Sequence, residues 1–310
     1  MKRLFPYLLL LALVSEVWAE VLPPLPQTQV VKLNDHVYAL LGPLELPTAE
    51  NRGYMVNSAV ILGEKGVILV DTGFSHEIGE HLKQAVKTIT NKPVTHIINT
   101  HDHGDHVLGN NAFPGATIIS SEQCKSVMEK TGYEWIGILE QTTGRTYPNT
   151  KPVVAGKGYA PGVHKQVMID GVNLTLWVPP GSHTATDMLV YLPQDRILIS
   201  GDVLENQLMP SFRDANVKNW IGTLQKIGTM QISNIIPGHG PLMQQADVKQ
   251  MLNRMQTFYA GVEAGYKQGL TDGEIRKQLD LTEWKKLKYF DEFIGLDVNR
   301  TYLEVEAANF

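Results

Sequence analysis

His101-Asp102-His103-Gly104-Asp105-His106 is the stretch that decides how this 310-residue sequence folds and what chemistry it carries. It follows directly on Val94 to Asn99, a run that is typical of a strand. Neutral imidazole is the commonest metal ligand in proteins, and zinc accepts both nitrogen and carboxylate oxygen. Because loops at strand ends often carry the reactive groups of a fold, the stretch predicts a metal site there. A solvated loop with histidines by chance is the alternative, and matched residues further along disfavour it.

Three later segments each carry one candidate ligand: His183 in a Pro-Gly-Ser-His-Thr segment, Asp202 after Ser200-Gly201, and His239 after Pro237-Gly238. Each is weak evidence alone, because a lone histidine or aspartate after a turn is usually a solvated turn residue. The His101–His106 stretch, Asp202 and His239 lie just beyond β-branched runs, and His183 follows another at a short distance. Together with the first stretch they give five histidines and two aspartates, too many for one tetrahedral zinc but suited to two ions that share a ligand.

Composition excludes some classes of function. The formal net charge of −5 provides no basic surface of the kind that nucleic acid requires, so no nucleic-acid partner is expected. Hydrophobic residues make up 43% of the chain, which is enough for a sizeable core. The single cysteine, Cys124, allows no disulfide within the chain.

The N-terminus resembles a secretory signal. Lys2 and Arg3 precede an apolar run from Leu4 to Val14, and small residues at positions 17 and 19 predict cleavage after Ala19. An uncleaved anchor is the alternative, but the run is too short to span a bilayer of ~30 Å, and Glu16 interrupts it. We therefore expect a signal peptide over residues 1–19, a periplasmic or secreted protein, and no stable membrane anchor after cleavage.

Hydrophobic periodicity divides the remaining chain into two strand-rich halves, each followed by helices. Strands are predicted at 36–41, 58–62, 67–70, 94–99, 117–120, 166–169, 172–178, 188–192, 196–200 and 234–236, and helices over 75–90, about 121–140, 216–227 and from 247 onward. Residues 141–165 have little periodicity and predict a long surface loop. The order fits an α/β fold with four αββα layers, although pattern alone does not select it over other α/β folds. We expect one domain over 20–245 and a C-terminal helical extension over 246–310.

With Val70-Asp71-Thr72-Gly73 upstream, these motifs resemble the metallo-β-lactamase superfamily of hydrolases over about residues 30–245. The resemblance implies the αββα sandwich and a dinuclear zinc site, with iron as the alternative metal. It implies that Asp71 orients the site without binding metal. Its implied ligands are His101, His103 and His183 for one ion, Asp105, His106 and His239 for the other, and Asp202 as the bridge between them.

The same resemblance implies an enzyme in which a hydroxide shared by two ions attacks an ester, thioester, lactone or amide carbonyl. Asp105 is the implied catalytic residue, which orients the nucleophile and passes a proton to the leaving group. The expected partner is a small-molecule substrate. The sequence gives neither its identity nor the oligomeric state.

Departures from the main zinc β-lactamase subclass narrow the activity. Asp202 stands where that subclass has cysteine, and Glu205 stands where it usually has a lysine that binds the substrate carboxylate. These residues disfavour an efficient β-lactamase and leave weak β-lactamase activity open. The ligand set resembles that of glyoxalase II, and the layout resembles exported metallohydrolases linked to quinoprotein systems. A mononuclear iron persulfide dioxygenase shares much of the ligand pattern and stays open beside the hydrolase, as does a non-catalytic scaffold on the same fold.

Some residues outside the motifs receive weaker interpretations. Tyr54, Trp135, Met209 and Phe212 lie in segments that could border the metal site, and packing is the favoured role for each. Five histidines without ligand spacing are assigned to the surface or the core: His36, His76, His81, His96 and His164.

Overall fold

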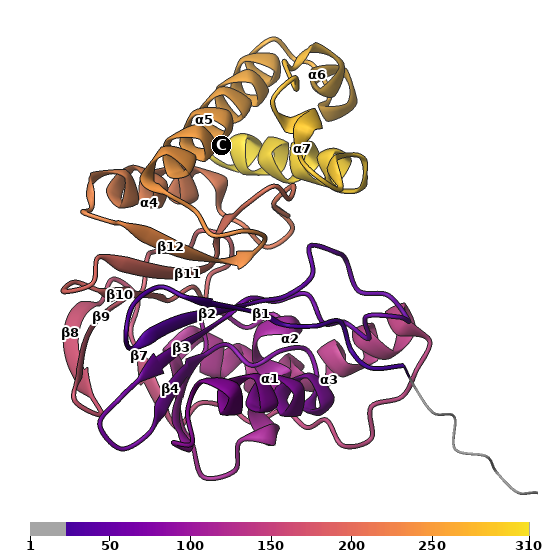
Figure 1. Cartoon of the computed structure of the whole chain (residues 1–310). Helices are drawn as coiled ribbons and strands as arrows, with labels where there is room; N and C mark the ends of the chain where they lie inside the picture. The colour runs from indigo at the N-terminus through magenta and orange to yellow at the C-terminus, as the bar shows by residue number, and fades with distance from the viewer. Residues whose placement is uncertain (1–22, 310) are drawn as a thin grey trace, which may run out of the picture.

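Two β-sheets pack face to face, with helices on both outer faces, in the computed structural model of the chain, which describes residues 23–309 (Figure 1). The first sheet has the strand order β1-β2-β3-β4-β5-β6-β7, and the second has the order β12-β11-β10-β9-β8. This arrangement confirms the predicted αββα sandwich. The predicted signal peptide, residues 1–19, lies outside the described residues.

The first sheet changes from antiparallel to parallel at β4. Its strands are β1 (Gln29–Lys32), β2 (Val37–Leu41), β3 (Ser58–Leu62), β4 (Val67–Val70), β5 (Val94–Ile98), β6 (Thr117–Ser121) and β7 (Lys157–Tyr159). The parallel pairs from β4 to β7 are joined by crossovers that contain α1 (His76–Ile89), α2 (Gly104–Val107) with the 3-10 helix η1 (Leu108–Ala112), and α3 (Glu122–Thr143). Because parallel strands run in one direction, the ends of β4 and β5 meet at the same edge.

The second sheet is antiparallel except for its last pair. Its strands are β8 (His164–Ile169), β9 (Val172–Trp177), β10 (Leu189–Leu192), β11 (Ile197–Glu205) and β12 (Asn234–His239). β11 and β12 are parallel and are joined through α4 (Val217–Thr229). Their carboxyl ends therefore also share an edge, and the candidate ligands of this sheet lie there.

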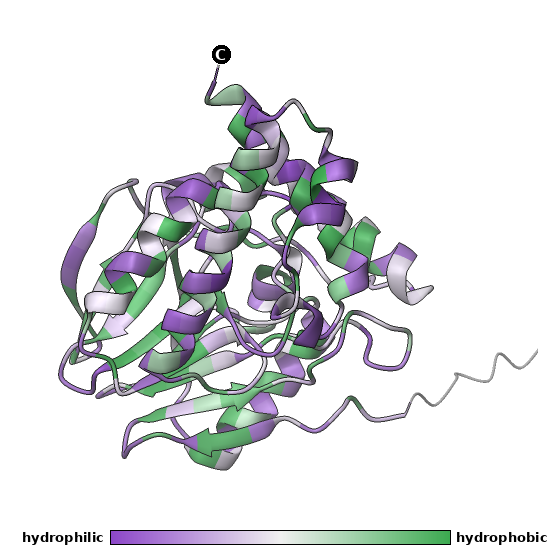
Figure 2. Ribbon diagram, turned by 90° about the horizontal axis from the view of Figure 1, so that it is seen from above, coloured by the Kyte–Doolittle hydropathy of each residue, from purple (hydrophilic) through white to green (hydrophobic). Residues whose placement is uncertain are grey.

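Successive side chains of a strand point to opposite faces of its sheet, so each strand contributes to two separate layers of the core. On β4, Ile68 and Val70 face the second sheet, whereas Val67 and Leu69 pack with α1. Hydrophobic residues accordingly make up much of both sheets in Figure 2, with hydrophilic residues on the helices around them. α1 begins after Ser75, whose hydroxyl accepts a hydrogen bond from the Ile78 N–H, as the sequence predicted.

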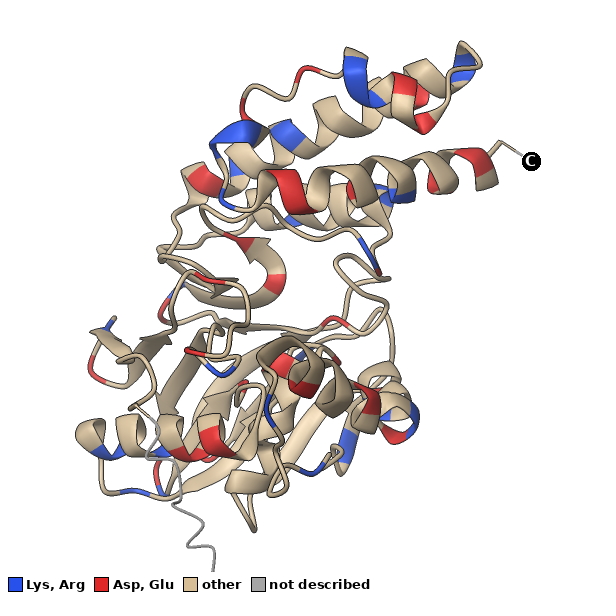
Figure 3. Ribbon diagram, turned by 90° about the vertical axis from the view of Figure 1, so that its right-hand side faces the viewer, with Lys and Arg blue, Asp and Glu red and all other residues tan. Residues whose placement is uncertain are grey.

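The C-terminal helices lie against the outer face of the second sheet. They are α5 (Gln245–Lys267), α6 (Asp272–Gln278), the 3-10 helix η2 (Trp284–Lys286) and α7 (Phe290–Ala307). Residues of α5 and α7 share one buried cluster with α4, β11 and β12. Charged residues of both signs are distributed along the outer helices in Figure 3, as expected for solvated faces. Among the described residues, no helix combines the length and apolarity that crossing a bilayer requires.

The prediction of a long surface loop over 141–165 was wrong. Tyr147, Thr150 and Ala155 are buried, and residues 157–159 form the edge strand β7, which pairs with β6. Because β7 is only three residues long and reads Lys-Gly-Tyr, it carries no β-branched or alternating pattern. Pairing with β6 makes residues 157–159 a strand, and the local sequence pattern does not reveal this pairing.

Two strands extend further than predicted, and this places the site residues inside the sheet. β11 continues through Asp202 to Glu205, and β12 continues to His239. Gly201 and Pro237 are residue types that weaken or interrupt strands, so the sequence predicted ends there. The structure accommodates Gly201 with a positive φ of 50° and a register shift between β11 and β12.

Candidate metal centre

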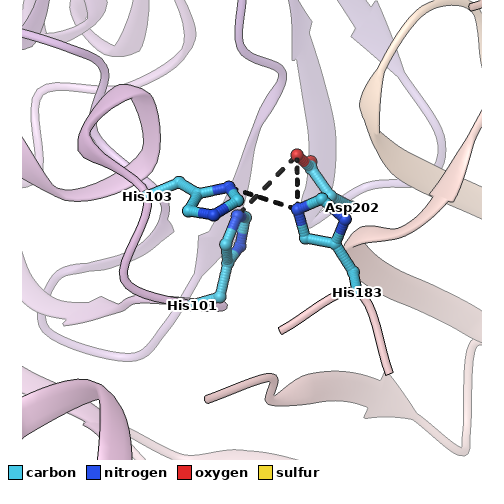
Figure 4. Close-up of side chains that lie close together, drawn as sticks. All are labelled: His101, His103, His183 and Asp202. Carbon is cyan, nitrogen blue, oxygen red and sulfur yellow. Dashed lines mark hydrogen bonds and ion pairs between the residues drawn. The ribbon is translucent and has the colours of Figure 1, made fainter. Parts of the chain in front are cut away.

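The seven candidate ligands, far apart in the sequence, lie together at one edge of the two sheets. His101 and His103 follow β5, and Asp105 and His106 lie on α2. His183 comes from the loop between β9 and β10, whereas Asp202 and His239 come from β11 and β12. Figure 4 shows His101 and His103 facing His183 and Asp202 across the gap between the sheets. The site is therefore assembled only when both sheets pack.

One group of donor atoms comprises His101, His103, His183 and Asp202. His183 Nε2 lies 3.2 Å from His103 Nδ1 and 3.6 Å from Asp202 Oδ2. His101 Nε2 lies 3.7 Å from the same carboxylate oxygen. The donor atoms of this group all lie within 4.8 Å of one another.

A second group comprises Asp105, His106 and His239. His239 Nε2 lies 3.2 Å from Asp105 Oδ2, and His106 Nε2 lies 3.5 Å from it. Asp202 joins the two groups, because its carboxylate oxygens also lie 3.2 Å from His106 Nε2 and 3.4 Å from His239 Nε2. A Cβ at Gly238 would overlap Asp202 Oδ1, so a glycine on the neighbouring strand gives this carboxylate its space.

Asp71 orients His106, in the place that the resemblance implied. Its Oδ2 accepts from His106 Nδ1 at 2.8 Å, and its carboxylate also accepts from the backbone N–H and the hydroxyl of Thr100 at 2.8 and 2.7 Å. The Asp71 backbone has a positive φ of 59°. These bonds leave His106 Nε2 directed at the centre, where a neutral ring could act as a donor.

Two other histidines are held by partners that the sequence did not predict. His103 Nε2 pairs with Asp214 at 3.1 Å, and His239 Nδ1 donates to the Met55 carbonyl at 3.1 Å. Each of these bonds leaves the opposite ring nitrogen toward the centre. No spacing rule connects Asp214 or Met55 to the histidines, because both partners come from distant loops.

Glu205, which the sequence placed at a substrate-binding position, also lies among the candidate ligands, and this was not predicted. Its carboxylate forms a third group of donor atoms with Asp202 and His239, and only 6% of the residue is exposed. Its Oε2 has no hydrogen-bond partner among the described residues. Burial, reinforced by repulsion from Asp202, raises the pKa of Glu205 well above its ordinary value.

The pKa shifts of four histidines of the site divide them into two pairs. Burial lowers the pKa of His101 well below its usual range and that of His183 to about 3, so both rings are neutral. Burial acts in the same direction on His106 and His239, but Asp202 and Asp105 outweigh it and raise the pKa of both rings. A cation would take the place of these protons between the rings and the carboxylates.

The donor set fits metal ions. His101 Nε2, His106 Nε2 and Asp202 Oδ1 are buried and have no hydrogen-bond partner among the described residues. Buried polar atoms without partners are costly, and a cation would satisfy these atoms together. Histidine nitrogens and carboxylate oxygens are the donors that zinc accepts, and they also suit iron. The five histidines assigned to surface or core lie outside the three donor groups.

A cavity of about 190 Å³ opens onto the donor atoms. Trp135 and Met209 line it, whereas Tyr54 and Phe212 are packed in the core, so the packing interpretation was incomplete for the first two. No residue of 141–165 lines this cavity. The fold and the cluster together define an αββα protein with a candidate metal centre between its sheets.

The sequence pattern of the metallo-beta-lactamase superfamily matches residues 51–239, which include all seven candidate ligands. The chain belongs to the metallo-beta-lactamase superfamily, as the His101–His106 stretch and its partners predicted. Membership of this superfamily and the cluster of candidate ligands support part of the functional prediction, namely a hydrolase of the superfamily with residues of metal-binding type.

Individual relatives agree with this membership. A metallo-beta-lactamase type 2 from Bacillus sp. (strain 170) is 27% identical over 59% of this chain and 66% of its own length. A linear primary-alkylsulfatase from Pseudomonas sp. (strain ATCC 19151) is 24% identical over 72% of this chain and 49% of its own length. The chain thus spans about half to two thirds of these relatives. A solved metallo-beta-lactamase from Pontibacter korlensis shares the fold, with a TM-score of 0.60, 23% identity, and coverage of 74% of this chain and 99% of that one.

Proposed function

We propose that the chain is a dinuclear zinc hydrolase that cleaves an ester, thioester, lactone or amide bond. His101, His103 and His183 would hold one ion, and Asp105, His106 and His239 the other, with Asp202 between them. The observation that carries the proposal is the position of Asp202, whose carboxylate lies within 3.7 Å of four histidine nitrogens from both donor groups.

When bound, the ions would supply Lewis-acid activation of water and of the scissile carbonyl. Asp105 lines the cavity, so it lies where it can orient the attacking water and carry a proton to the leaving group. Burial works against ionisation of Asp105, but His106 and His239 outweigh it and hold its pKa below the ordinary value. The carboxylate is therefore available as an acceptor at neutral pH.

The proposal is tested with a panel of ester, thioester, lactone and amide substrates on zinc-loaded protein. His101→Ala removes one ligand and should lower kcat/KM for the active substrate by about 10²–10³-fold, the scale on which the loss of a main catalytic electrostatic group acts. His164→Ala, an exposed histidine on β8, is the matched control and should leave turnover unchanged. Equal activity of the His101→Ala protein and the wild type would refute the assignment.

A persulfide dioxygenase with one iron ion is the second candidate, and it rests on the first donor group, which could hold a single ion without the second. Elemental analysis together with oxygen uptake on a persulfide substrate separates it from the hydrolase. One iron per chain with oxygen consumption would favour the dioxygenase.

The two relatives suggest further substrates for the same panel. The alkylsulfatase match supports including an alkyl sulfate, and the β-lactamase match supports including a β-lactam. We propose at most weak β-lactam turnover, because Glu205 stands where the main zinc β-lactamase subclass usually has lysine, and it supplies no cation there for the β-lactam carboxylate.

We also propose export to the periplasm or secretion, with a mature chain that begins at Glu20. The basic pair Lys2 and Arg3, followed by the apolar run, supports this proposal. N-terminal sequencing of protein from the periplasmic fraction tests it. An uncleaved Met1 in a cytoplasmic fraction would contradict it.

A further inference from the structure

Part of the wall of the cavity over the candidate metal centre comes from outside the segment that matches the superfamily. That segment ends at residue 239, yet Phe293 on α7 lines the same cavity as His103 and Asp202. Through Phe293, α7 thus contributes directly to the space that a substrate would occupy.

The start of α7 is tied to both loops that border the cavity. Leu208 and Lys288 form a bridge, in which the Met209 N–H donates to the Lys288 carbonyl at 2.9 Å and the Lys288 N–H donates to the Gln207 carbonyl at 2.9 Å. The next residue, Tyr289, accepts a hydrogen bond from the Leu46 N–H at 3.1 Å through its hydroxyl. Two adjacent residues therefore position one loop that carries Leu46 and another that carries Leu208.

The walls built in this way are apolar. Phe293, Leu46, Pro47 and Leu208 line this part of the cavity, and Trp135 and Ile138 of α3 also line it. Apart from the candidate ligands, the polar lining residues are Glu205, Ser211 and Arg213. An apolar wall around a few convergent polar groups is the composition that binds a substrate with an apolar portion.

We propose that Phe293, with Leu46 and Leu208, forms a substrate-selecting wall that binds the aliphatic chain of an acyl group. The substrate class is thereby narrowed to acyl compounds whose chain extends several carbons from the scissile bond. This inference takes the reaction, hydrolysis, from the proposed function. The preference for a long acyl chain follows from the apolar wall that contains Phe293.

The test compares two p-nitrophenyl esters, the hexanoate and the acetate, on zinc-loaded full-length protein. Each buried methylene is worth about fourfold in binding, so the wild type should prefer the hexanoate in kcat/KM. Phe293→Ala should lower the hexanoate-to-acetate ratio by about tenfold, and Phe293→Leu should restore most of it. Leu303→Ala, which removes an exposed leucine from the same helix, is the matched control and should leave the ratio unchanged.

A binding measurement keeps this inference separate from the proposed reaction. Calorimetric titration of the wild type with sodium hexanoate and with sodium acetate should show tighter binding of hexanoate, and Phe293→Ala should reduce that difference. If neither ester is hydrolysed but the binding difference is present, the hydrolase fails and the wall stands. An unchanged ratio and an unchanged binding difference in folded Phe293→Ala protein would overturn the inference.

Discussion

At the scale of single residues, the site depends on which ring nitrogen each histidine directs at the centre. Asp71 holds His106, the Met55 carbonyl holds His239, and Asp214 holds His103. In each case the partner occupies one nitrogen and leaves the other free as a donor. A fixed ring loses little freedom on binding a cation, so these partners would raise metal affinity.

Asp214 provides a direct test of this arrangement, because it contacts His103 and is itself no candidate ligand. Its carboxylate lies 3.1 Å from His103 Nε2 and accepts from Arg213 Nε at 2.8 Å. Asp214→Ala should weaken zinc binding by about 10–100-fold, the usual effect of removing a partner of a metal-binding histidine. Competition with a chromophoric chelator measures the affinity.

Asp291→Ala is the matched control, since this aspartate is exposed on α7. It should bind zinc as the wild type does. Wild-type zinc affinity in Asp214→Ala would mean that the contact with His103 does not position the ring.

The sequence predicted the seven candidate ligands because their residue types and spacing follow strands. It did not predict Asp214, the Met55 carbonyl or the place of Glu205 in the cluster. Asp214 and Met55 reach the histidines only through the packing of distant loops, and a backbone carbonyl has no sequence signature. Glu205 was interpreted from the resemblance as a residue at the substrate-binding position, and its place beside the candidate ligands was not predicted because the predicted strand ended before it.

At the scale of elements, α7 is joined to the loop after β11 by a buried carboxyl group. Asp297 is fully buried, its Oδ1 accepts from the Phe212 N–H at 2.8 Å, and its Oδ2 has no partner among the described residues. Burial raises the pKa of Asp297 well above its ordinary 3.8, against the opposing effect of that hydrogen bond. Between the ordinary and the raised pKa, Asp297 therefore keeps its proton in the folded state, whereas in the unfolded state it has released it.

This raised pKa predicts a loss of stability as pH rises. The contribution of Asp297 is fully present below the ordinary carboxyl range and is lost as pH rises from there through the raised value, with a slope of up to about 1.4 kcal/mol per pH unit. Asp297→Asn keeps an acceptor for Phe212 but does not ionise. The free energy of unfolding of the variant, relative to the wild type, should therefore increase with pH.

Urea unfolding of both proteins at several pH values measures this difference. Asp291→Asn, at an exposed position of the same helix, should show no such trend. A difference between Asp297→Asn and wild type that is constant across pH would show that the buried carboxyl does not titrate differently in the folded state.

Helices and strands were predictable where the hydrophobic periodicity was strong. They were not predictable where pairing with a distant strand determines the structure. α1 was predicted with its Ser75 cap because apolar residues recur at helical spacing over its full length. β7 was missed because three residues at a sheet edge carry no period. β11 and β12 were shortened in the prediction because Gly201 and Pro237 normally weaken or interrupt strands, whereas here a register shift between the strands accommodates them.

At the scale of the whole molecule, the candidate metal centre joins the two sheets. Four candidate ligands follow β5 of the first sheet, and three belong to segments of the second. A bound cation would therefore act as a cross-link between layers that otherwise meet through apolar contacts. The apolar interface between the sheets is large, so the fold does not depend on the metal alone.

This arrangement predicts that chelation lowers stability without unfolding the protein at room temperature. Because each ion binds only the folded state, the removal of one ion should cost about 4 kcal/mol when free zinc is about a thousand times the dissociation constant of that ion. Thermal unfolding with and without a chelator measures the change in Tm. The His101→Ala protein should show a smaller change, and equal Tm values for the chelated and zinc-loaded wild type would contradict the cross-link.

Anomalous X-ray diffraction from zinc-loaded crystals, recorded on both sides of the zinc absorption edge, locates the ions directly. We predict two peaks per chain, one among His101, His103 and His183 and one among Asp105, His106 and His239, with the Asp202 carboxylate between them. A single peak, or peaks remote from Asp202, would contradict the dinuclear centre.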